Sequence, residues 1–556
     1  MVGWYDPPQL LRTAIDVATS TIIGAQADNR LIEGFVSDAN TPQIHDYTID
    51  DAAAADGTAA PRKELWLDCV SDLGEGWNAT YAVAKALAES PLTVHDAVTV
   101  PGVETRRAMP RARVLMIGGD LVYPVASRDE YQARCVGPYA CALPHTDEPS
   151  PDYYAVPGNH DWYDGLVAFT RLFCNNRWLG GWRSKQARSY TALRLPGGWW
   201  LLGTDLQLDS DIDAPQLAFF RSVAAQMAPT DRVIIYGHYP HWIFAKWYGK
   251  FDPAMAENNL NNLAFLDDDV LRNRVRVLIA GHLHYYCRHA HADGRQKITT
   301  GGGGAFLHPT HASDMQELAG GFSLKSCYPP AATSRRLAWQ NLGFLFRNPY
   351  FGVVPALLYA LTAYAVDADI GHRGPHEFLG ALGDVTRDIL SRSPLGAFLV
   401  VVLMGGVMLF TDTHSPTYRR VAGFLHALAH VGAAFVLAWA ISGFLVRQLG
   451  YPFGSIPFSA LGLFMMFAGG WVVGSVILGI YLLISLNVFG RHYNEAFSSL
   501  RIEDWKSFLR LHITPAGDLE IYSLGIPRVS RTWPPKTDGS EPAPKVELVE
   551  PVIVCR

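Results

Sequence analysis

Five short motifs in the first half of the chain carry side chains that bind metal ions or transfer protons. In chain order they are Asp72-Leu73-Gly74, Gly119-Asp120-Leu121-Val122-Tyr123, Gly158-Asn159-His160-Asp161, Ile235-Tyr236-Gly237-His238 and Gly281-His282-Leu283-His284. Imidazole and carboxylate groups are ligands of iron, zinc and manganese in proteins. Two metal ions about 3.5–4 Å apart need a carboxylate that binds both, with further ligands for each. The five motifs together therefore predict a shared site for two metal ions.

Taken one at a time, these motifs also have structural explanations. A single His282-Leu283-His284 segment is more often a loop with a hydrogen-bonded histidine than a metal site. Asp120 follows a glycine, which lets the backbone approach closely and suits a bridging carboxylate. His282 and His284 are two residues apart, so each can reach a different metal ion. The ordered set of five motifs, rather than any single member, indicates the site.

Each motif directly follows a short apolar segment that we predict to be a strand. The segments are KELWLDCV, ARVLMIGGD, DYYAVPGNHD, RVIIYGHYP and VRVLIAGHLH. They alternate with helix-like segments, a pattern typical of an α/β domain with buried sheets. Ligand sites in open α/β sheets lie at the carboxyl ends of the strands. The five loops are therefore expected to converge on one crevice.

Four apolar stretches follow, at residues 349–366, 395–411, 421–446 and 456–489. The first three contain no Asp, Glu, Lys or Arg and approach the roughly 20 residues that span a bilayer. The fourth is longer, and it predicts either one helix with a re-entrant segment around 454–457 or two short helices. Four such stretches are difficult to bury as core helices of one soluble domain. We predict a multi-pass membrane region.

The distribution of Lys and Arg around these stretches predicts their orientation. With four spans, nine basic residues lie on the side of both soluble regions and four on the other side. Because basic residues are enriched in cytoplasmic loops, we expect the catalytic domain and the C-terminal tail in the cytoplasm. A fifth span would place the tail outside. We see no cleavable signal peptide at the N-terminus.

Composition restricts the class of protein further. The 556 residues exceed the usual size of one domain. The net charge of −6 gives no support for nucleic-acid binding through a basic surface. The seven cysteines are irregularly spaced without a CxxC pair, which argues against a structural zinc site. Cys135 and Cys141 are close enough in sequence to bridge, but reduced thiols are the simpler expectation and fit a cytosolic domain.

We predict five regions along the chain. They are an N-terminal helix (about 8–25) and linker at 1–62, a catalytic domain at 63–340, a transmembrane domain of about four helices at 349–489, a soluble α/β segment at 490–530 and a disordered tail at 531–556. The tail is assigned from its content of proline and charge.

The motif set resembles the calcineurin-like metallophosphoesterase superfamily over about residues 63–310. Most members begin with Asp-x-His, whereas position 74 is glycine and the second motif ends in Tyr123. That combination resembles the purple acid phosphatase branch, in which a tyrosine replaces the missing histidine as a ligand of a ferric ion. The resemblance implies an α/β fold, with a metallophosphoesterase-type β-sandwich flanked by helices, here followed by a multi-span α-helical membrane domain.

The resemblance also implies a ligand set and a metal pair. One metal ion would be held by Asp72, Asp120, Tyr123 and His284, and the other by Asp120, Asn159, His238 and His282. The metals would be iron plus a divalent ion of zinc, manganese or iron. A metal-activated hydroxide would attack phosphorus. His160 would contact phosphate and protonate the leaving group with Asp161 as its partner, and His241 is the second candidate.

The chain departs from secreted purple acid phosphatases because it carries a membrane region and no signal peptide. Its longer context is similar to large membrane-bound metallophosphoesterase-type proteins of bacteria and plants. Acid-phosphatase activity is therefore not carried over, and a lipid phosphoester is one candidate substrate. The alternative is a transporter or receptor regulated by its metallophosphoesterase domain. A non-catalytic scaffold and a nuclease are less favoured, because no ligand motif is lost and no basic groove is evident.

Three other features have open interpretations. His426 and His430 lie on one face of a membrane helix and predict either a polar pathway or interhelical hydrogen bonds. Glycines 301–304 either offer amides to phosphate or form a turn that brings His308 and His311 to the site. Trp242, Trp247 and Tyr248 either cover the substrate pocket or pack at the membrane surface.

Overall fold

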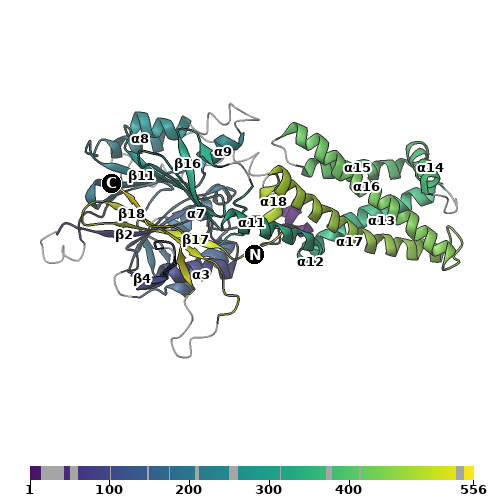
Figure 1. The fold of residues 1–556 in the computed structure, drawn as a ribbon, viewed down its shortest axis with the longest axis horizontal. Coiled ribbons are helices and arrows are strands. Elements are labelled where there is room, and N and C mark those ends of the chain that lie inside the picture. The colour runs from purple at the N-terminus through teal and green to yellow at the C-terminus, as the bar shows by residue number, and fades with distance from the viewer. Residues whose placement is uncertain are drawn as a thin grey trace. The chain divides into compact units, whose positions relative to one another are not determined.

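The computed structural model describes residues 1–13, 15, 43–50, 60–100, 102–146, 150–174, 176–206, 212–248, 261–312, 315–370, 378–411, 415–533 and 544–556. These residues form two compact units (Figure 1). The sheet unit comprises Met1–Val2, Arg12–Ser334 and Arg501–Arg556, and the helical unit comprises Gly3–Leu11 and Arg335–Leu500. Along the chain, most of the helical unit is therefore an insertion into the sheet unit.

The sheet unit contains two mixed sheets. Within the described residues the first runs in the order β1 (Ile44–Asp46), β9 (Thr191–Leu195), β10 (Trp199–Gly203), β11 (Arg232–Tyr236), β12 (Val275–Ala280), β14 (Gln296–Thr300), β13 (Tyr286–Ala290), β16 (Phe322–Tyr328) and β15 (Glu317–Leu318). The second runs in the order β4 (Thr105–Met109), β3 (Leu92–Asp96), β19 (Val546–Leu548), β18 (Leu519–Ile526), β17 (Lys506–Ile513), β2 (Leu65–Val70), β5 (Val114–Gly118), β6 (Asp152–Val156), β8 (Trp182–Ser184) and β7 (Trp178–Leu179), with β20 (Ile553–Cys555) paired to β18.

The main apolar core of this unit lies between the two sheets. Leu67 and Met116 from the second sheet and Leu201 and Ile234 from the first are fully buried in one cluster. Each such side chain contributes about 1.5–3 kcal/mol through its removal from water. Helices cover the outer faces, among them α3 (Trp77–Ala88) on the second sheet and α8 (Ala214–Ala224) on the first. The arrangement confirms the predicted α/β sandwich flanked by helices.

The remaining helices of the sheet unit are short. Those with both ends described are α4 (Arg128–Tyr131), α5 (Gly137–Ala142), α6 (Asn159–Trp162), α7 (Val167–Phe173) and α9 (His241–Tyr248), and α11 (Ala331–Ala338) contains the boundary between the units.

The chain from Arg501 onward belongs to the sheet unit, whereas residues 490–500 belong to the helical unit. The region predicted as a soluble segment at 490–530 is therefore divided between the units, and β17 pairs with β18 along its length and with β2 over Leu509–Ile513 (Figure 1). The region 531–556 is not a disordered tail throughout, because β19 pairs with β3 and β18, and β20 pairs with β18. Val546 and Leu548 alternate with charged residues and are buried. An average over the composition does not reveal this alternation, so the composition alone suggested disorder.

A buried ion pair joins β17 to β2. The guanidinium group of Arg510 donates to both carboxylate oxygens of Asp68, from Nε over 2.7 Å and from Nη2 over 2.8 Å. Arg510 also donates to the Pro110 carbonyl over 3.0 Å. Both charged side chains are almost fully buried, and this two-point geometry satisfies them together.

The N-terminal region is only partly described. Residues 7–13 are helical, but most of the predicted helix at about 8–25 lies outside the described residues. β1 falls within the region predicted as helix and linker, and it pairs with β9 in the first sheet.

The helical unit consists mainly of α13 (Val353–Ile370), α14 (Phe378–Ser391), α15 (Pro394–Phe410), α16 (Pro416–Arg447) and α17 (Ile456–Phe489), with the shorter α12 (Phe344–Arg347) and α18 (Tyr493–Ser498). Three stretches among the described residues are long and apolar enough to cross a membrane: Pro349–Val366, α16 and α17. The remaining predicted stretch, 395–411, falls in α15, which forms a pair bent by 102° with α14. α17 is one unbroken helix of 34 residues, because Pro457 lies in its first turn, where proline is tolerated.

His426 and His430 join helices within this unit. His430 Nδ1 lies 2.8 Å from the Tyr359 hydroxyl on α13, and its Nε2 lies 3.2 Å from Nε2 of His426. The ring of His426 stacks on Tyr481 of α17 with centroids 3.8 Å apart. These contacts agree with the interhelical interpretation of the pair.

The expectation of reduced cysteines throughout is wrong. Cys287 on β13 and Cys327 on β16 occupy opposite positions in the sheet and form a disulfide. Sequence spacing could not reveal this pair, because 40 residues separate its members. Cys135 and Cys141, the alternative pair, are both free.

Candidate metal centre

Loops after five strands bring predicted metal ligands together. β2, β5 and β6 run parallel in the second sheet, and β11 and β12 run parallel in the first. Their carboxyl ends are followed, respectively, by Asp72, Asp120, Asn159, His238 and His282. Because neighbouring parallel strands end at the same edge of a sheet, the ligands lie on adjacent loops.

Three of these residues have left-handed backbone conformations. Asp72, Asp120 and His282 have φ angles of 60°, 49° and 66°. Non-glycine residues rarely adopt this region, and such strain concentrates at functional sites. Hydrogen bonds hold the conformation: the Asp72 amide donates to Gly119 O over 3.0 Å, and the His282 amide donates to Asp72 Oδ2 over 2.8 Å.

Gly158 allows the loop before α6 to approach Asp120. A Cβ atom at this position would lie 2.0 Å from Asp120 Oδ1. The amide of His160 donates to the same oxygen over 2.9 Å. One carboxylate oxygen of Asp120 is thus held by backbone, and Oδ2 is left to face the other ligands.

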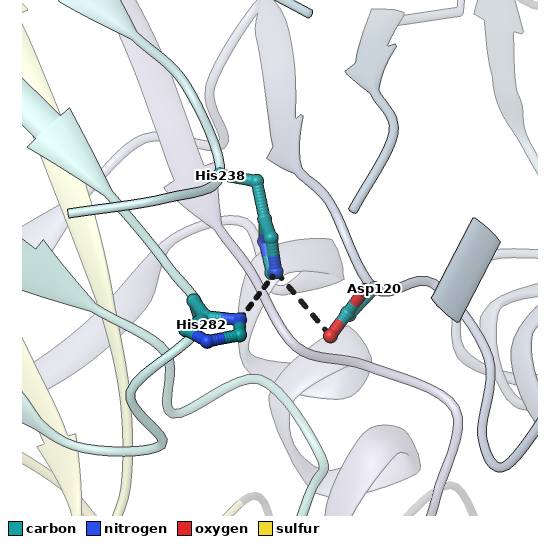
Figure 2. A group of neighbouring side chains, drawn as sticks. All are labelled: Asp120, His238 and His282. Carbon is teal, nitrogen blue, oxygen red and sulfur yellow. Dashed lines mark hydrogen bonds and ion pairs between the residues drawn. The ribbon is translucent and has the colours of Figure 1, made fainter. Parts of the chain in front are cut away.

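One ligand group consists of Asp120, His238 and His282. Figure 2 shows His238 between the other two side chains. Its Nε2 lies 3.3 Å from Asp120 Oδ2 and 3.2 Å from His282 Nδ1. The three ligand atoms lie within 4.8 Å of one another, close enough to bind a single metal ion.

Asn159 offers a further oxygen beside this group. Its Nδ2 donates to the Tyr163 hydroxyl over 3.1 Å. Its Oδ1 is buried and has no hydrogen-bond partner among the described residues. A buried acceptor without a partner costs about 1–3 kcal/mol. A metal ion is the kind of partner that would satisfy it.

A second ligand group surrounds the hydroxyl of Tyr123. This oxygen lies 3.0 Å from each of Asp72 Oδ1, Asp120 Oδ2 and His284 Nε2. Asp120 therefore contacts both groups, as a bridging carboxylate would. The structure brings all seven predicted metal ligands to one place.

Backbone carbonyls orient two of the imidazoles. His238 Nδ1 lies 2.9 Å from Gly118 O, and His284 Nδ1 lies 2.8 Å from Phe306 O. Since a carbonyl only accepts, each Nδ1 carries the proton and each Nε2 faces the site. Such partners fix the tautomer of metal-binding histidines.

The charges of the site are strongly coupled. Burial raises the pKa of Asp72 well above its usual range, although His238 opposes this. Burial would also raise the pKa of Asp120, but His238 and His160 lower it overall. Burial alone would lower the pKa of His238, but Asp120 and Asp72 raise it to about 9. Two carboxylates and a phenol buried together are a favourable environment for cations.

His160 and Asp161 have different surroundings. His160 Nδ1 lies 2.6 Å from Pro124 O, and its ring centroid lies 4.4 Å from that of Tyr123. The carboxylate of Asp161 accepts from the amides of Gly158 and Leu121 and from the Tyr131 hydroxyl. We predicted Asp161 as the partner of His160, but the contacts described for its carboxylate are with Gly158, Leu121 and Tyr131. It holds together the two loops that carry Asp120 and Asn159.

His241 lies in the first turn of α9. It lines a small cavity together with His238, Thr204 and Trp242. His241 thus lies beside one of the ligand groups, and its role as a proton donor stays a prediction.

The sequence analysis identified only some of the aromatic residues around α9. Trp242 is 4% exposed and packs inside the sheet unit, so it does not form an exposed cover. The residues that flank His282 are Tyr239 and Phe244, whose rings stack at 4.2 Å. Trp247 packs against Phe244 with centroids 5.1 Å apart. Tyr239 could have been identified from the sequence, because it directly follows His238.

The glycine-rich loop after β14 forms a turn. The amide of Gly303 donates to Ser71 O over 2.9 Å, so it is used within the protein. The turn brings His308 onto His284, with ring centroids 3.9 Å apart. His311 instead bonds the Ser334 hydroxyl over 2.8 Å.

Two buried charged residues near His284 were not identified from the sequence. They are Glu75, three residues after Asp72, and Lys506, at the start of β17. Glu75 belongs to no recognisable motif, and more than 200 residues separate Lys506 from the nearest ligand motif. Only the strand pairing reveals that they belong to the site.

Comparison with known proteins agrees with this geometry. Residues 65–286 match the family model of the calcineurin-like phosphoesterases. A search of curated proteins finds no match. Residues 65–286 of the sheet unit are therefore similar to a calcineurin-like phosphoesterase domain, as the motif resemblance predicted.

Similar solved structures cover about half of the chain. One is GAP50, the anchor in the inner membrane complex of Plasmodium, with 13% identity, a TM-score of 0.32, and coverage of 48% of this chain and 80% of that one. Another is purple acid phosphatase PPD1 from yellow lupin (Lupinus luteus), with 17% identity, a TM-score of 0.29, and coverage of 44% and 45%. A third is PhoD, with 11% identity, a TM-score of 0.29, and coverage of 44% and 58%.

Proposed function

We propose that this protein is a membrane-anchored phosphoesterase that uses two metal ions. The observation that carries the proposal is the carboxylate of Asp120, whose Oδ2 lies 3.0 Å from the Tyr123 hydroxyl and 3.3 Å from His238 Nε2. One carboxylate between two ligand groups is the arrangement that two-metal hydrolysis requires. The family match supports the same reaction class.

The donor atoms fit two different metal ions. Asp72, Asp120, Tyr123 and His284 would hold one ion, and Asp120, Asn159, His238 and His282 would hold the other. The first set includes a phenol, which suits iron, and the second combines imidazole, amide and carboxylate, which suits zinc, manganese or iron. Bound there, the ions would supply positive charge to the phosphate oxygens and a coordinated water acidic enough to act as the nucleophile.

The chain's own residues have separate tasks in this reaction. His160 is half-buried beside Tyr123, and the Pro124 carbonyl fixes its ring through Nδ1. Its Nε2 is the atom that would donate a proton to the leaving-group oxygen. Asp161 holds the amides of Gly158 and Leu121 and so maintains the distance between the two loops.

The strand pairing supports an even number of membrane crossings. β2 precedes the helical unit in the chain, β17 follows it, and the two strands pair in one sheet. Both ends of the helical unit must therefore lie on the same side of a bilayer. Pro349–Val366, α16 and α17 account for three crossings. α15, with 17 apolar residues, would supply the fourth.

The excess of basic residues on the side of the sheet unit supports a cytoplasmic location for that unit, whereas its Cys287–Cys327 disulfide is typical of an oxidising compartment. Because we propose that the protein is attached to a bilayer, a lipid phosphoester is a candidate beside soluble substrates. The negative net charge gives no support for a nucleic-acid substrate.

The test is hydrolysis of p-nitrophenyl phosphate, bis-p-nitrophenyl phosphate and a phosphatidate-containing vesicle by the full-length protein in detergent. Iron plus a divalent metal is supplied, and Asp120→Asn is compared with Asp293→Asn. Asp293 is partly exposed, and its carboxylate bonds only nearby groups. Metal-dependent turnover that Asp120→Asn lowers by about 100-fold or more, and that Asp293→Asn retains, would support the proposal.

Equal turnover in the two variants would contradict the assigned site. Absence of turnover in a protein shown to hold two metal ions would instead favour the regulatory alternative. If turnover is found, the ratio of monoester, diester and lipid hydrolysis would identify the substrate class.

A further inference from the structure

The peptide group between Ala305 and Phe306 lies between two buried side chains of opposite charge. The ammonium group of Lys506 donates to the Ala305 carbonyl. The carboxylate of Glu75 accepts from the Phe306 amide over 2.6 Å. Lys506 is 0% exposed and Glu75 is 1% exposed, so water screens neither charge. A cation at the oxygen end and an anion at the N–H end match the peptide dipole and fix its orientation.

The same loop contacts two of the proposed ligands. The Ala305 amide donates to the Asp72 carbonyl over 2.9 Å. The Phe306 carbonyl accepts from Nδ1 of His284 over 2.8 Å. This second bond places the proton of His284 on Nδ1 and leaves Nε2 facing Tyr123. The 305–306 peptide lies between the two peptide groups that make these contacts, so its orientation constrains both the bond to Asp72 and the tautomer of His284.

A second contact ties β17 to this loop. The Ser507 amide donates to Gly302 O over 3.0 Å. A side chain at Gly302 would meet Ser507, because its Cβ would lie 2.2 Å from the serine Oγ. The loop and the first residues of β17 are therefore packed without free space between them.

We propose that Lys506 and Glu75 are positioning residues of the metal centre, which fix the 305–306 peptide and, through it, the ring and tautomer of His284. The inference rests on the two-metal function proposed above. It makes β17 a part of the catalytic apparatus, although β17 lies outside the family match at 65–286 and after the helical unit.

The test measures metal affinity of the full-length protein in detergent, with Zn²⁺ titrated against a competing chelator, together with the unfolding temperature. The variants are Lys506→Met, Lys506→Arg and Glu75→Gln. Lys297→Met is the matched control, because Lys297 is a partly buried lysine that lies 4.1 Å over the Phe322 ring. Loss of such outer partners typically lowers metal affinity about 10–100-fold.

We expect that loss for Lys506→Met and Glu75→Gln, recovery in Lys506→Arg, and unchanged affinity in Lys297→Met. Glu75→Gln keeps an oxygen that can accept from the Phe306 amide, so it tests the charge even if Lys506→Met fails to fold. Wild-type affinity in a folded Glu75→Gln or Lys506→Met protein would overturn the inference. Failure of the wild-type protein itself to bind metal would instead overturn the proposed function.

Discussion

Gly74 and Tyr123 are joined by a backbone hydrogen bond, in which the Tyr123 amide donates to the Gly74 carbonyl over 3.1 Å. Gly74 has a φ of +51°, and a Cβ atom there would lie 2.1 Å from Leu121 O. A histidine at position 74 would therefore collide with the loop that carries Tyr123. The same local packing therefore excludes histidine at position 74 and holds the loop that carries Tyr123.

Replacement of Tyr123 by phenylalanine should remove a metal ligand and leave the fold intact. The ring keeps its packing, but the oxygen 3.0 Å from Asp72, Asp120 and His284 is lost. We expect the visible absorption of a phenolate–iron complex to disappear, with metal affinity about tenfold lower or more. Absorption spectra of the iron-loaded protein check this.

Tyr139→Phe is the matched control for that experiment. Tyr139 is fully buried, and its hydroxyl has no hydrogen-bond partner among the described residues. Its replacement should leave the spectrum unchanged. A visible band that persists in Tyr123→Phe would show that Tyr123 does not bind the metal.

Replacement of His160 by asparagine should slow the hydrolysis of esters with poor leaving groups most. A phenolate with a low pKa leaves without a proton, whereas an alkoxide needs a proton donor. Loss of a general acid costs about 10²–10⁴-fold in rate for the alkyl ester. We expect a much smaller effect with p-nitrophenyl phosphate. An equal loss of kcat for both esters would assign His160 to phosphate binding alone.

Replacement of Arg510 by methionine should destabilise the sheet unit strongly. It would leave the Asp68 carboxylate buried without its cation, which costs about 3–5 kcal/mol. Arg295→Met is the comparison, because Arg295 pairs with Asp293 at a partly exposed position and such pairs contribute about 0–1 kcal/mol. Unfolding temperatures of the two variants check the difference. Similar small shifts would mean that the strand pairing does not depend on this ion pair.

Asp96 should contribute to stability in a pH-dependent way. Burial would raise its pKa, but hydrogen bonds from Thr99, Val98 and Arg107 outweigh this and lower it to about 2. Since the folded-state value lies below the unfolded value of 3.8, the contribution is present above about pH 4 and is lost as the pH falls towards 2. The shift corresponds to about 2 kcal/mol.

The check is the unfolding temperature of the wild-type protein and of Asp96→Asn between pH 2 and 6. The variant should be less stable than wild type near pH 6, and the difference should shrink as the pH falls. A constant difference across this range would show that the Asp96 carboxylate is not linked to folding.

The sequence was sufficient to predict which side chains gather at the candidate metal centre, because each belongs to a short motif after an apolar strand. Asp72 and Asp120, for example, follow the neighbouring parallel strands β2 and β5, which end at one edge of a sheet, whereas His238 follows β11 in the other sheet and meets them only because the two sheets pack together. The sequence was not sufficient for Lys506, which reaches its loop through the β2–β17 pairing across the whole helical unit. Sequence spacing carries no information on pairing over such a distance. Cys287 and Cys327 were missed for the same reason.

Composition was misleading for the C-terminus. β19 and β20 are short and interrupted by charge, so an average over 25 residues resembles a disordered tail. Burial of alternate residues such as Val546 and Leu548 depends on the edge that β18 and β3 provide. Asp161 was assigned to His160 by adjacency alone, and its actual partners come from other loops.

The insertion of the helical unit also fixes an order of events during synthesis. When the ribosome has completed residues 65–334, β2 still lacks β17, and its free edge resembles the exposed strand edges that pair with other chains and cause aggregation. β17, with Lys506 and Arg510, emerges only after every helix of the inserted unit has been made. On the proposed function, the metal centre would be completed only after the inserted helices have been made, so an active intermediate without its membrane region would not accumulate.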